Sequence, residues 1–180
     1  MNWVWYRNVP DGHPLEALLT DRSGLRHDLS LAPGAVGLDR IEELREAAGD
    51  LPPVFTDLVR ATLSPFIQVI VDLEVPAMVR GRVCLAGDAA FALRPHIAAG
   101  TAKAAADARA LADAILVAGG DVPAALRAWE PGQLALGRAT TARTREVGKR
   151  AQVTNTFRPG DPEVAFGLHR PKDGNFPAGT

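Results

Sequence analysis

One stretch of the sequence constrains the fold more than any other: a short apolar run at residues 83–86 that ends in Gly87-Asp88. The run does not alternate with polar residues and has a glycine near each end, which is typical of a strand buried on both faces of a parallel sheet. Residues 98–118 follow with 11 alanines and end at Gly119-Gly120, a pattern that predicts a helix with a glycine stop. A buried strand followed by such a helix predicts an α/β fold.

The spacing of apolar residues predicts the elements on either side of this stretch. Strands are expected at residues 2–9, 25–31 and 66–75, where side chains alternate or β-branched residues cluster. Helices are expected at residues 14–19, at residues 38–48, from Pro52 to just before Pro65, and after Asp121, where Pro131 is expected to kink or break the helix. The whole chain is therefore expected to be of the α/β class, as an α+β fragment with part of a sheet, one buried strand with its helix, and C-terminal helices.

Composition excludes several classes of protein. Hydrophobic residues make up 47% and charged residues 23%, as in soluble globular domains. No run approaches the roughly 20 apolar residues of a membrane helix, and the N-terminus lacks a secretory signal. One cysteine, Cys84, and four scattered histidines show no zinc spacing, so no metal site and a reduced, cytoplasmic environment are expected.

A basic segment near the C-terminus does not predict nucleic-acid binding. It has no interleaved aromatic residues and no recognition motif, so a solvated helix face, or a face that pairs with the acidic part of a larger protein, is favoured. The basic residues in question are Arg138, Arg143, Arg145, Lys149 and Arg150.

The chemistry of the chain is expected where the predicted buried strand meets the alanine-rich helix. Asp88 falls beyond the carboxyl end of the strand, where ligands of open parallel sheets bind, and its carboxylate could accept hydrogen bonds from sugar or ribityl hydroxyls. The helix start near Ala98 would offer unpaired N–H groups and small side chains to a flat, electron-rich ligand. From the residues alone, Asp88 could equally cap the turn.

Three longer sequence segments indicate a protein family more specifically. They are NWVWYRNVP, FIQVIVDLEVPAMVRGRVCLAGDAAF and RPHIAAGTAKAAADA, and together they extend over most of residues 1–150. These phrases resemble the class A FAD-dependent aromatic monooxygenases, which have the p-hydroxybenzoate hydroxylase fold. Within that family they are most similar to the 2,6-dihydroxypyridine 3-monooxygenase branch. One departure is that Ile97 stands where common relatives have a glycine.

The resemblance implies roles for residues in the loop and turn. Asp88, after Gly87, would bind the ribityl chain of FAD, and the loop with the helix start would contact the isoalloxazine ring. His96 lies in this loop and is the candidate catalytic residue, as a contact to flavin or substrate. The implied cofactor-binding residues are Gly87, Asp88, Arg94, Pro95, Ala98, Ala99, Gly100 and Thr101.

The resemblance also implies a reaction. NADH or NADPH would reduce FAD, and molecular oxygen would then hydroxylate a small, electron-rich aromatic or N-heteroaromatic substrate. The protein would place the rings, support the reduced flavin electrostatically and exclude water.

The sequence contains no Gly-x-Gly-x-x-Gly after a strand, so the pyrophosphate site of the family is absent. The chain is therefore expected to represent the C-terminal half of such an enzyme and to bind FAD weakly by itself. The expected parts are a partial substrate-binding domain at 1–78, a C-terminal piece of the FAD-binding domain at 79–118, a helical region at 119–157 and a loop-like tail at 158–180. Its partner would be the missing N-terminal half or a second copy. The alternative is a non-catalytic remnant or interaction module.

Several polar and aromatic residues have simpler explanations than a role in a site. Lys103 could support the reduced flavin, but its spacing from Asp107 is also that of a simple pair on a helix surface. Trp3 and Trp5 are more typical of a half-buried core than of an aromatic pocket. Asp72 is expected to be exposed to solvent, as is Gln68.

Overall fold

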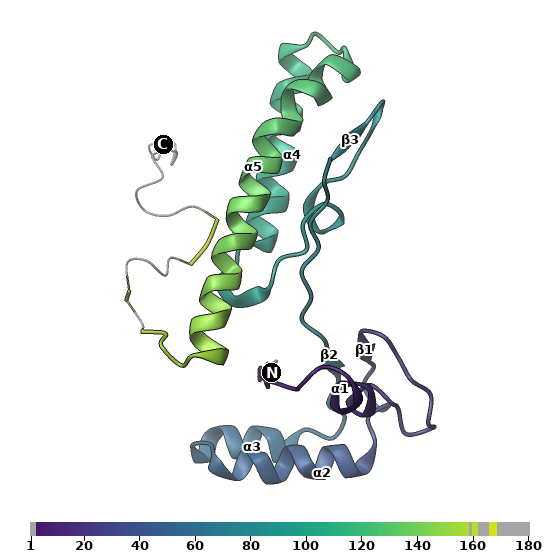
Figure 1. The fold of residues 1–180 in the computed structure, drawn as a ribbon, viewed down its shortest axis with the longest axis vertical. Coiled ribbons are helices and arrows are strands. Elements are labelled where there is room, and N and C mark those ends of the chain that lie inside the picture. Colours follow the sequence, from purple (N-terminus) through teal and green to yellow (C-terminus); the bar gives the residue numbers. More distant parts are fainter. Residues whose placement is uncertain (1–2, 159, 162–165, 169–180) are drawn as a thin grey trace. The chain divides into compact units, whose positions relative to one another are not determined.

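The computed structural model describes residues 3–158, 160–161 and 166–168. The chain divides into two compact units, Met1–Ile70 and Val71–Thr180, and each is described here by itself (Figure 1). None of the helices in the described ranges has the length and apolar character needed to span a bilayer. Of the expected tail at 158–180, the described residues carry no helix or strand, and the rest lie outside the described ranges.

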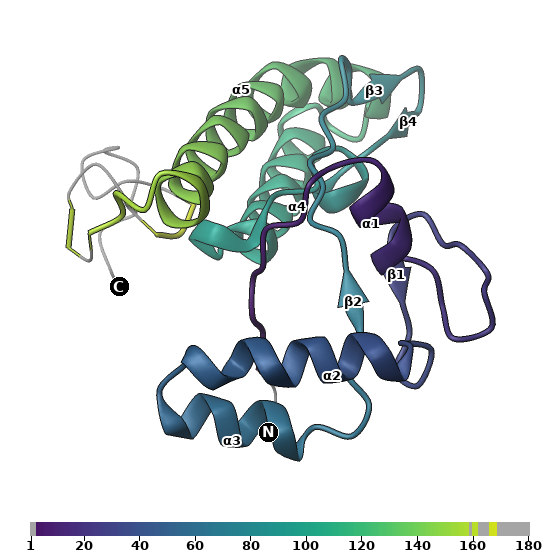
Figure 2. The same ribbon diagram turned by 60° about the horizontal axis from the view of Figure 1, so that its bottom comes forward.

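The first unit is built from short helices and one minimal pair of strands. The helices α2 and α3 lie side by side (Figure 2). In β1 and β2, which pair antiparallel, Ser30 is opposite Gln68 and Leu31 is opposite Ile67. A small core of Leu31, Val36 and Ile41 fills the space beneath them. The elements are α1 (His13–Leu18), β1 (Ser30–Leu31), α2 (Leu38–Ala47), the 3-10 turn η1 (Ala48–Asp50), α3 (Pro53–Ala61) and β2 (Ile67–Gln68).

The prediction of long strands in this unit is largely wrong. Residues 3–10 have no regular secondary structure, and the strands expected at 25–31 and 66–75 shrink to two residues each. The predicted alternation survives at the N-terminus, where Trp3 and Trp5 are half-buried while Val4 and Tyr6 are exposed. A segment with alternating side chains forms a strand only when another strand accepts and donates hydrogen bonds to its backbone N–H and C=O groups.

A network of hydrogen bonds around Asp21 replaces the first part of the expected second strand. The Asp21 carboxylate accepts hydrogen bonds from the hydroxyl and the backbone N–H of Ser23, and it contacts the His27 ring at 2.8 Å. These hydrogen bonds, with the Ser23 hydroxyl contributing most, hold the pKa of Asp21 well below its usual range. The turn therefore keeps its charge when ordinary aspartates become protonated.

The second unit consists of a hairpin, two short turns and two long helices. The helices α4 and α5 pack against each other (Figure 1). Gly119 and Gly120 end α4 with positive φ angles, as predicted, and the Asp121 side chain caps α5 by accepting a hydrogen bond from the Ala124 N–H. The elements are β3 (Val79–Arg80), β4 (Val83–Cys84), the 3-10 turns η2 (Gly87–Ala89) and η3 (Pro95–Ile97), α4 (Gly100–Val117), α5 (Val122–Gly148) and the π-helical turn η4 (Lys149–Val153).

The expected α/β class is confirmed, but within the described residues the run at 83–86 is not buried between parallel strands. β4 pairs antiparallel with β3 in a hairpin, and Val83 is 67% exposed. The described residues contain no parallel strand that could cover this run. Its apolar character is therefore not explained by burial within the described part of the chain.

Phe91 anchors the core of the second unit. Its ring is fully buried among Met78, Leu126 and Trp129, and it lies so close to α5 that a Cβ on Gly137 would overlap it. Pro131 was expected to kink or break the helix, and it does not break it, because α5 continues through this residue.

Glu130, next to Pro131, fixes the hairpin to α5. Its carboxylate accepts hydrogen bonds from the backbone N–H groups of Met78 and Val79, at 2.7 and 2.9 Å. The segment that leads into β3 is thereby tied to the middle of the longest helix.

Candidate functional site

The Gly87-Asp88 turn adopts a conformation that requires glycine. Gly87 has a φ of 57°, and a Cβ at this position would lie 3.2 Å from the Cβ of Ala104 on α4. Its buried N–H donates a hydrogen bond to the Asp107 carboxylate at 2.8 Å. The turn is thus packed directly onto α4, which fixes where Asp88 emerges.

Asp88 is exposed, and its side chain has no hydrogen bond or ion pair among the described residues. Its Oδ1 lies 4.0 Å from the position that a Cβ on Gly100 would take, so the carboxylate is beside the first residue of α4. In the described part of the chain, no side chain caps the N-terminus of α4, and Asp88 does not cap its own turn. The carboxylate and the N–H groups at this helix end therefore share one polar edge.

The loop of residues 94–98 leads into α4 through a strained residue. Ala98 has φ 54° and ψ 35°, the left-handed region, and is exposed. On either side of it, Ile97 and Ala99 are buried against Val147 of α5. Ile97, the departure from the usual glycine, is therefore a core residue that anchors the loop.

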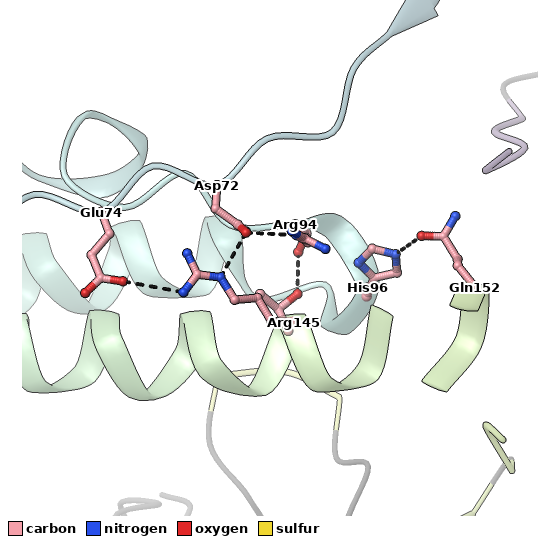
Figure 3. Close-up of polar contacts among 7 residues, drawn as sticks. Asp72, Glu74, Arg94, His96, Arg145 and Gln152 are labelled. Carbon is pink, nitrogen blue, oxygen red and sulfur yellow. Dashed lines mark hydrogen bonds and ion pairs between the residues drawn. The ribbon is translucent and has the colours of Figure 1, made fainter. Parts of the chain in front are cut away.

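Arg94 is held by two other segments of the unit. Its Nε donates a hydrogen bond to Asp72 at 2.9 Å, and its backbone carbonyl accepts one from the Thr144 hydroxyl at 2.7 Å (Figure 3). Arg145 donates to the same oxygen of Asp72 at 2.9 Å. The expectation that Asp72 is exposed is therefore wrong, whereas Gln68 is exposed as expected.

His96 is also fixed by the end of the helical region. Its Nε2 lies 2.6 Å from the amide oxygen of Gln152 (Figure 3), and a Cβ on Gly148 would lie 2.8 Å from its ring. The remaining residues of the expected site, Pro95 and Thr101, are exposed beside it. The structure thus places the turn, the loop and the helix start in one unit, with His96 on the side facing α5.

A buried ion pair beneath the site was not expected from the sequence. Lys103 and Asp107 are 1% and 0% exposed, and their Nζ and Oδ2 atoms are 2.7 Å apart. The Lys103 ammonium also lies 4.8 Å from the centroid of the Phe91 ring. The expectation of a helix-surface pair is wrong, since the pair faces the core and ties α4 to the Gly87 turn.

Basic residues of α5 and η4 pair with acidic residues of this chain itself. On α5, Arg138 and Arg145 pair with acidic residues that precede β3, and on η4 Arg150 pairs with Glu146 and Asp161. Arg143 is instead buried and donates hydrogen bonds to the carbonyls of Gly167 and Leu168. Among the described residues, no cluster of His, Cys, Asp or Glu could hold a metal ion.

Comparison with known proteins confirms the resemblance drawn from the sequence. A family model described as FAD binding domain-like matches residues 1–72. The chain is 39% identical to 2,6-dihydroxypyridine 3-monooxygenase of Paenarthrobacter nicotinovorans over 168 residues, which are 93% of this chain and 42% of that protein. The chain therefore spans about two fifths of the length of this curated relative.

Solved structures give the same result. The structure of 2,6-dihydroxypyridine-3-hydroxylase from Arthrobacter nicotinovorans matches 91% of this chain, and 41% of its own, with a TM-score of 0.83 and 39% identity. Klebsiella pneumoniae HpxO, complexed with FAD and uric acid, matches 64% of this chain and 31% of its own, with a TM-score of 0.53 and 25% identity. The family-model match lies almost entirely in the first unit, and the assignment of 1–78 to a partial substrate-binding domain stays a prediction.

Proposed function

We propose that this chain supplies the flavin-ring-binding part of an FAD-dependent monooxygenase that hydroxylates an electron-rich N-heteroaromatic ring. The observation that carries the proposal is the exposed carboxylate of Asp88, which no described residue engages, beside the uncapped N-terminus of α4. The 39% identity to a 2,6-dihydroxypyridine 3-monooxygenase supports the same reading.

The residues at this edge fit a flavin. Asp88 would accept hydrogen bonds from ribityl hydroxyls, and the exposed loop residues Pro95 and Ala98 would line the ring. The small residues at the start of α4 allow a flat ring to approach the backbone closely. Once bound, FAD would take reducing equivalents from NADH or NADPH and activate molecular oxygen.

The chain's own contribution would be electrostatic and geometric. The free N–H groups at the start of α4 and the positive end of its dipole would favour negative charge on a bound ligand. Buried Ile97 and Ala99 keep the loop backbone in place. His96 would present its ring at the edge of the loop in an orientation fixed by Gln152. Its role as a contact to flavin or substrate belongs to this proposal.

The substrate class is inferred from the relatives. The relatives named above act on or bind hydroxylated or oxo-substituted nitrogen heterocycles, namely 2,6-dihydroxypyridine and uric acid. We therefore expect the substrate to be a small ring of this kind. We also expect the protein to work in the cytoplasm.

An interaction module is the second candidate function, and the hairpin favours it. Val83 and Leu85 expose apolar side chains on a two-stranded hairpin, which offers unpaired edges to a partner. The complementary part of a monooxygenase would be such a partner, so the two functions differ in whether the assembled protein holds FAD.

A chimera separates the two functions. The segment of the Paenarthrobacter nicotinovorans enzyme that aligns with this chain is replaced by the full 180-residue chain, and the product formed from 2,6-dihydroxypyridine is measured. A monooxygenase part predicts hydroxylated product and substrate-stimulated oxidation of NADH or NADPH. A folded chimera that forms neither would favour the interaction module.

Replacing Asp88 tests the carboxylate itself. In the chimera, Asp88→Ala should weaken FAD binding about 10- to 100-fold, because a lost charge-assisted hydrogen bond costs about 1.5–3 kcal/mol. Flavin titration of the apo-protein measures this change. Asp113→Ala is the matched control, since Asp113 is an exposed carboxylate on α4 whose one ion-pair partner among the described residues is Arg109. An unchanged FAD affinity with a lowered apo-protein Tm would show instead that Asp88 is structural.

A further inference from the structure

We propose that Asp72 is a positioning residue that holds the loop of residues 94–98 in the geometry flavin binding needs, an inference that rests on the proposed function of that loop. Asp72 lies in the segment before β3, and none of the sequence patterns assigned it this role. It would act through Arg94, the first residue of the loop.

Asp72 joins two arginines from different parts of the second unit. Its Oδ2 accepts hydrogen bonds from the Nε atoms of Arg94 and Arg145, both at 2.9 Å (Figure 3). The Asp72 side chain is only 10% exposed, and its other oxygen is buried without a hydrogen bond among the described residues. The two arginines therefore contact a carboxylate that is largely shielded from water, and such charge-assisted contacts are strong.

The same turn of α5 holds the backbone of the loop. Thr144, the neighbour of Arg145, donates its hydroxyl proton to the carbonyl oxygen of Arg94 at 2.7 Å. Thr144 thus holds the main chain of Arg94 directly, whereas the Arg94 side chain is held by Asp72, which the adjacent Arg145 also contacts. Arg145 also lies 3.9 Å from Glu74, which keeps the segment around Asp72 beside α5.

The loop needs this support because it contains a strained residue. Ala98 adopts a left-handed conformation that is unfavourable for a residue with a Cβ, and such strain persists only where the surroundings enforce it. Buried Ile97 holds the loop on one side and the Asp72–Arg94 contact holds its beginning. Loss of the contact should therefore loosen the turn that ends at Ala98.

Hydrogen exchange on the full 180-residue chain tests the positioning role without any ligand. The Ala98 N–H donates to the Pro95 carbonyl at 3.0 Å, so its exchange rate reports whether the turn is closed. In Asp72→Asn, the Ala98 amide should exchange about tenfold faster, or more, while amides in the middle of α4 keep their rates. The control variant is Asp113→Asn, which removes an exposed carboxylate that also accepts a hydrogen bond from an arginine Nε at 2.9 Å. It should change neither the exchange rate at Ala98 nor the rates in the middle of α4. Equal acceleration throughout α4 and α5, or none at Ala98, would overturn the proposal.

Flavin binding by the chimera provides the second readout. Asp72→Asn should weaken FAD binding about tenfold in the wild-type background and should have almost no effect in an Arg94→Gln background, because Asp72 acts through Arg94. An equal loss of FAD affinity in both backgrounds would mean that Asp72 stabilises the fold in general, and the proposal would fail. A chimera that never binds FAD would refute the proposed function instead, and the exchange rates would still decide the positioning role.

Discussion

Asp107→Ala is expected to lower the free energy of unfolding of the second unit by about 3–5 kcal/mol, because it leaves the Lys103 ammonium buried without its partner. The substitution also removes the acceptor for the buried N–H of Gly87. Urea unfolding followed by the fluorescence of Trp129, in a Trp3→Phe, Trp5→Phe background, reads this unit directly. Trp129 is buried, and its indole N–H donates to the Asp107 carbonyl.

Two further variants show whether the loss comes from the buried charge. Asp113→Ala removes a carboxylate from the exposed side of the same helix and should change stability by less than about 1 kcal/mol. The double variant Lys103→Met, Asp107→Leu removes both charges, so it should recover much of the stability that Asp107→Ala loses. An Asp107→Ala protein as stable as Asp113→Ala would contradict a buried pair at this position.

Phe91→Ala should destabilise the same unit by about 3–5 kcal/mol, the usual cost of truncating a fully buried phenylalanine. The cavity would not close easily, because the ring lies against the backbone of α5 at Gly137. Lys103 would also lose the aromatic face beside its ammonium. Differential scanning calorimetry measures the effect as a large drop in Tm.

Leu116→Ala is the control for Phe91→Ala. It truncates a large apolar side chain at the exposed end of α4, where the leucine is 78% exposed. Its effect on stability should stay within about 0.5 kcal/mol. Similar Tm values for the two variants would mean that Phe91 is not the anchor of this core.

The helices of this protein follow from local sequence signals, which explains why they could be predicted. Pro53 at the start of α3, the Asp121 cap and the Gly119-Gly120 stop each act within one turn of the chain. The expected strands depended on partners elsewhere in the chain. The pattern of residues 2–9 and 66–75 could show which side chains alternate, but not whether another backbone would pair with them.

The site was only partly predictable, because some of its contacts also join residues that are far apart in the sequence. The Gly-Asp turn and the helix start lie in one continuous phrase, and the structure places Asp88 beside Gly100. The apolar pattern alone does not predict the burial of Lys103 and Asp107, because alanines lie all around α4 and its inner face, which carries Leu111 and Ala114, is only weakly marked. Asp72 was misjudged because the arginine that holds it from α5 lies 73 residues further along the chain.

The content of bound FAD in the chimera tests the central claim most directly. If this chain provides the flavin-ring-binding part of a monooxygenase, the purified chimera should keep about one FAD per chain through gel filtration, as its absorbance spectrum would show. The Asp88→Ala chimera should keep much less under the same conditions. A wild-type chimera that is folded but colourless, under conditions in which the unmodified Paenarthrobacter nicotinovorans enzyme stays yellow, would contradict the claim.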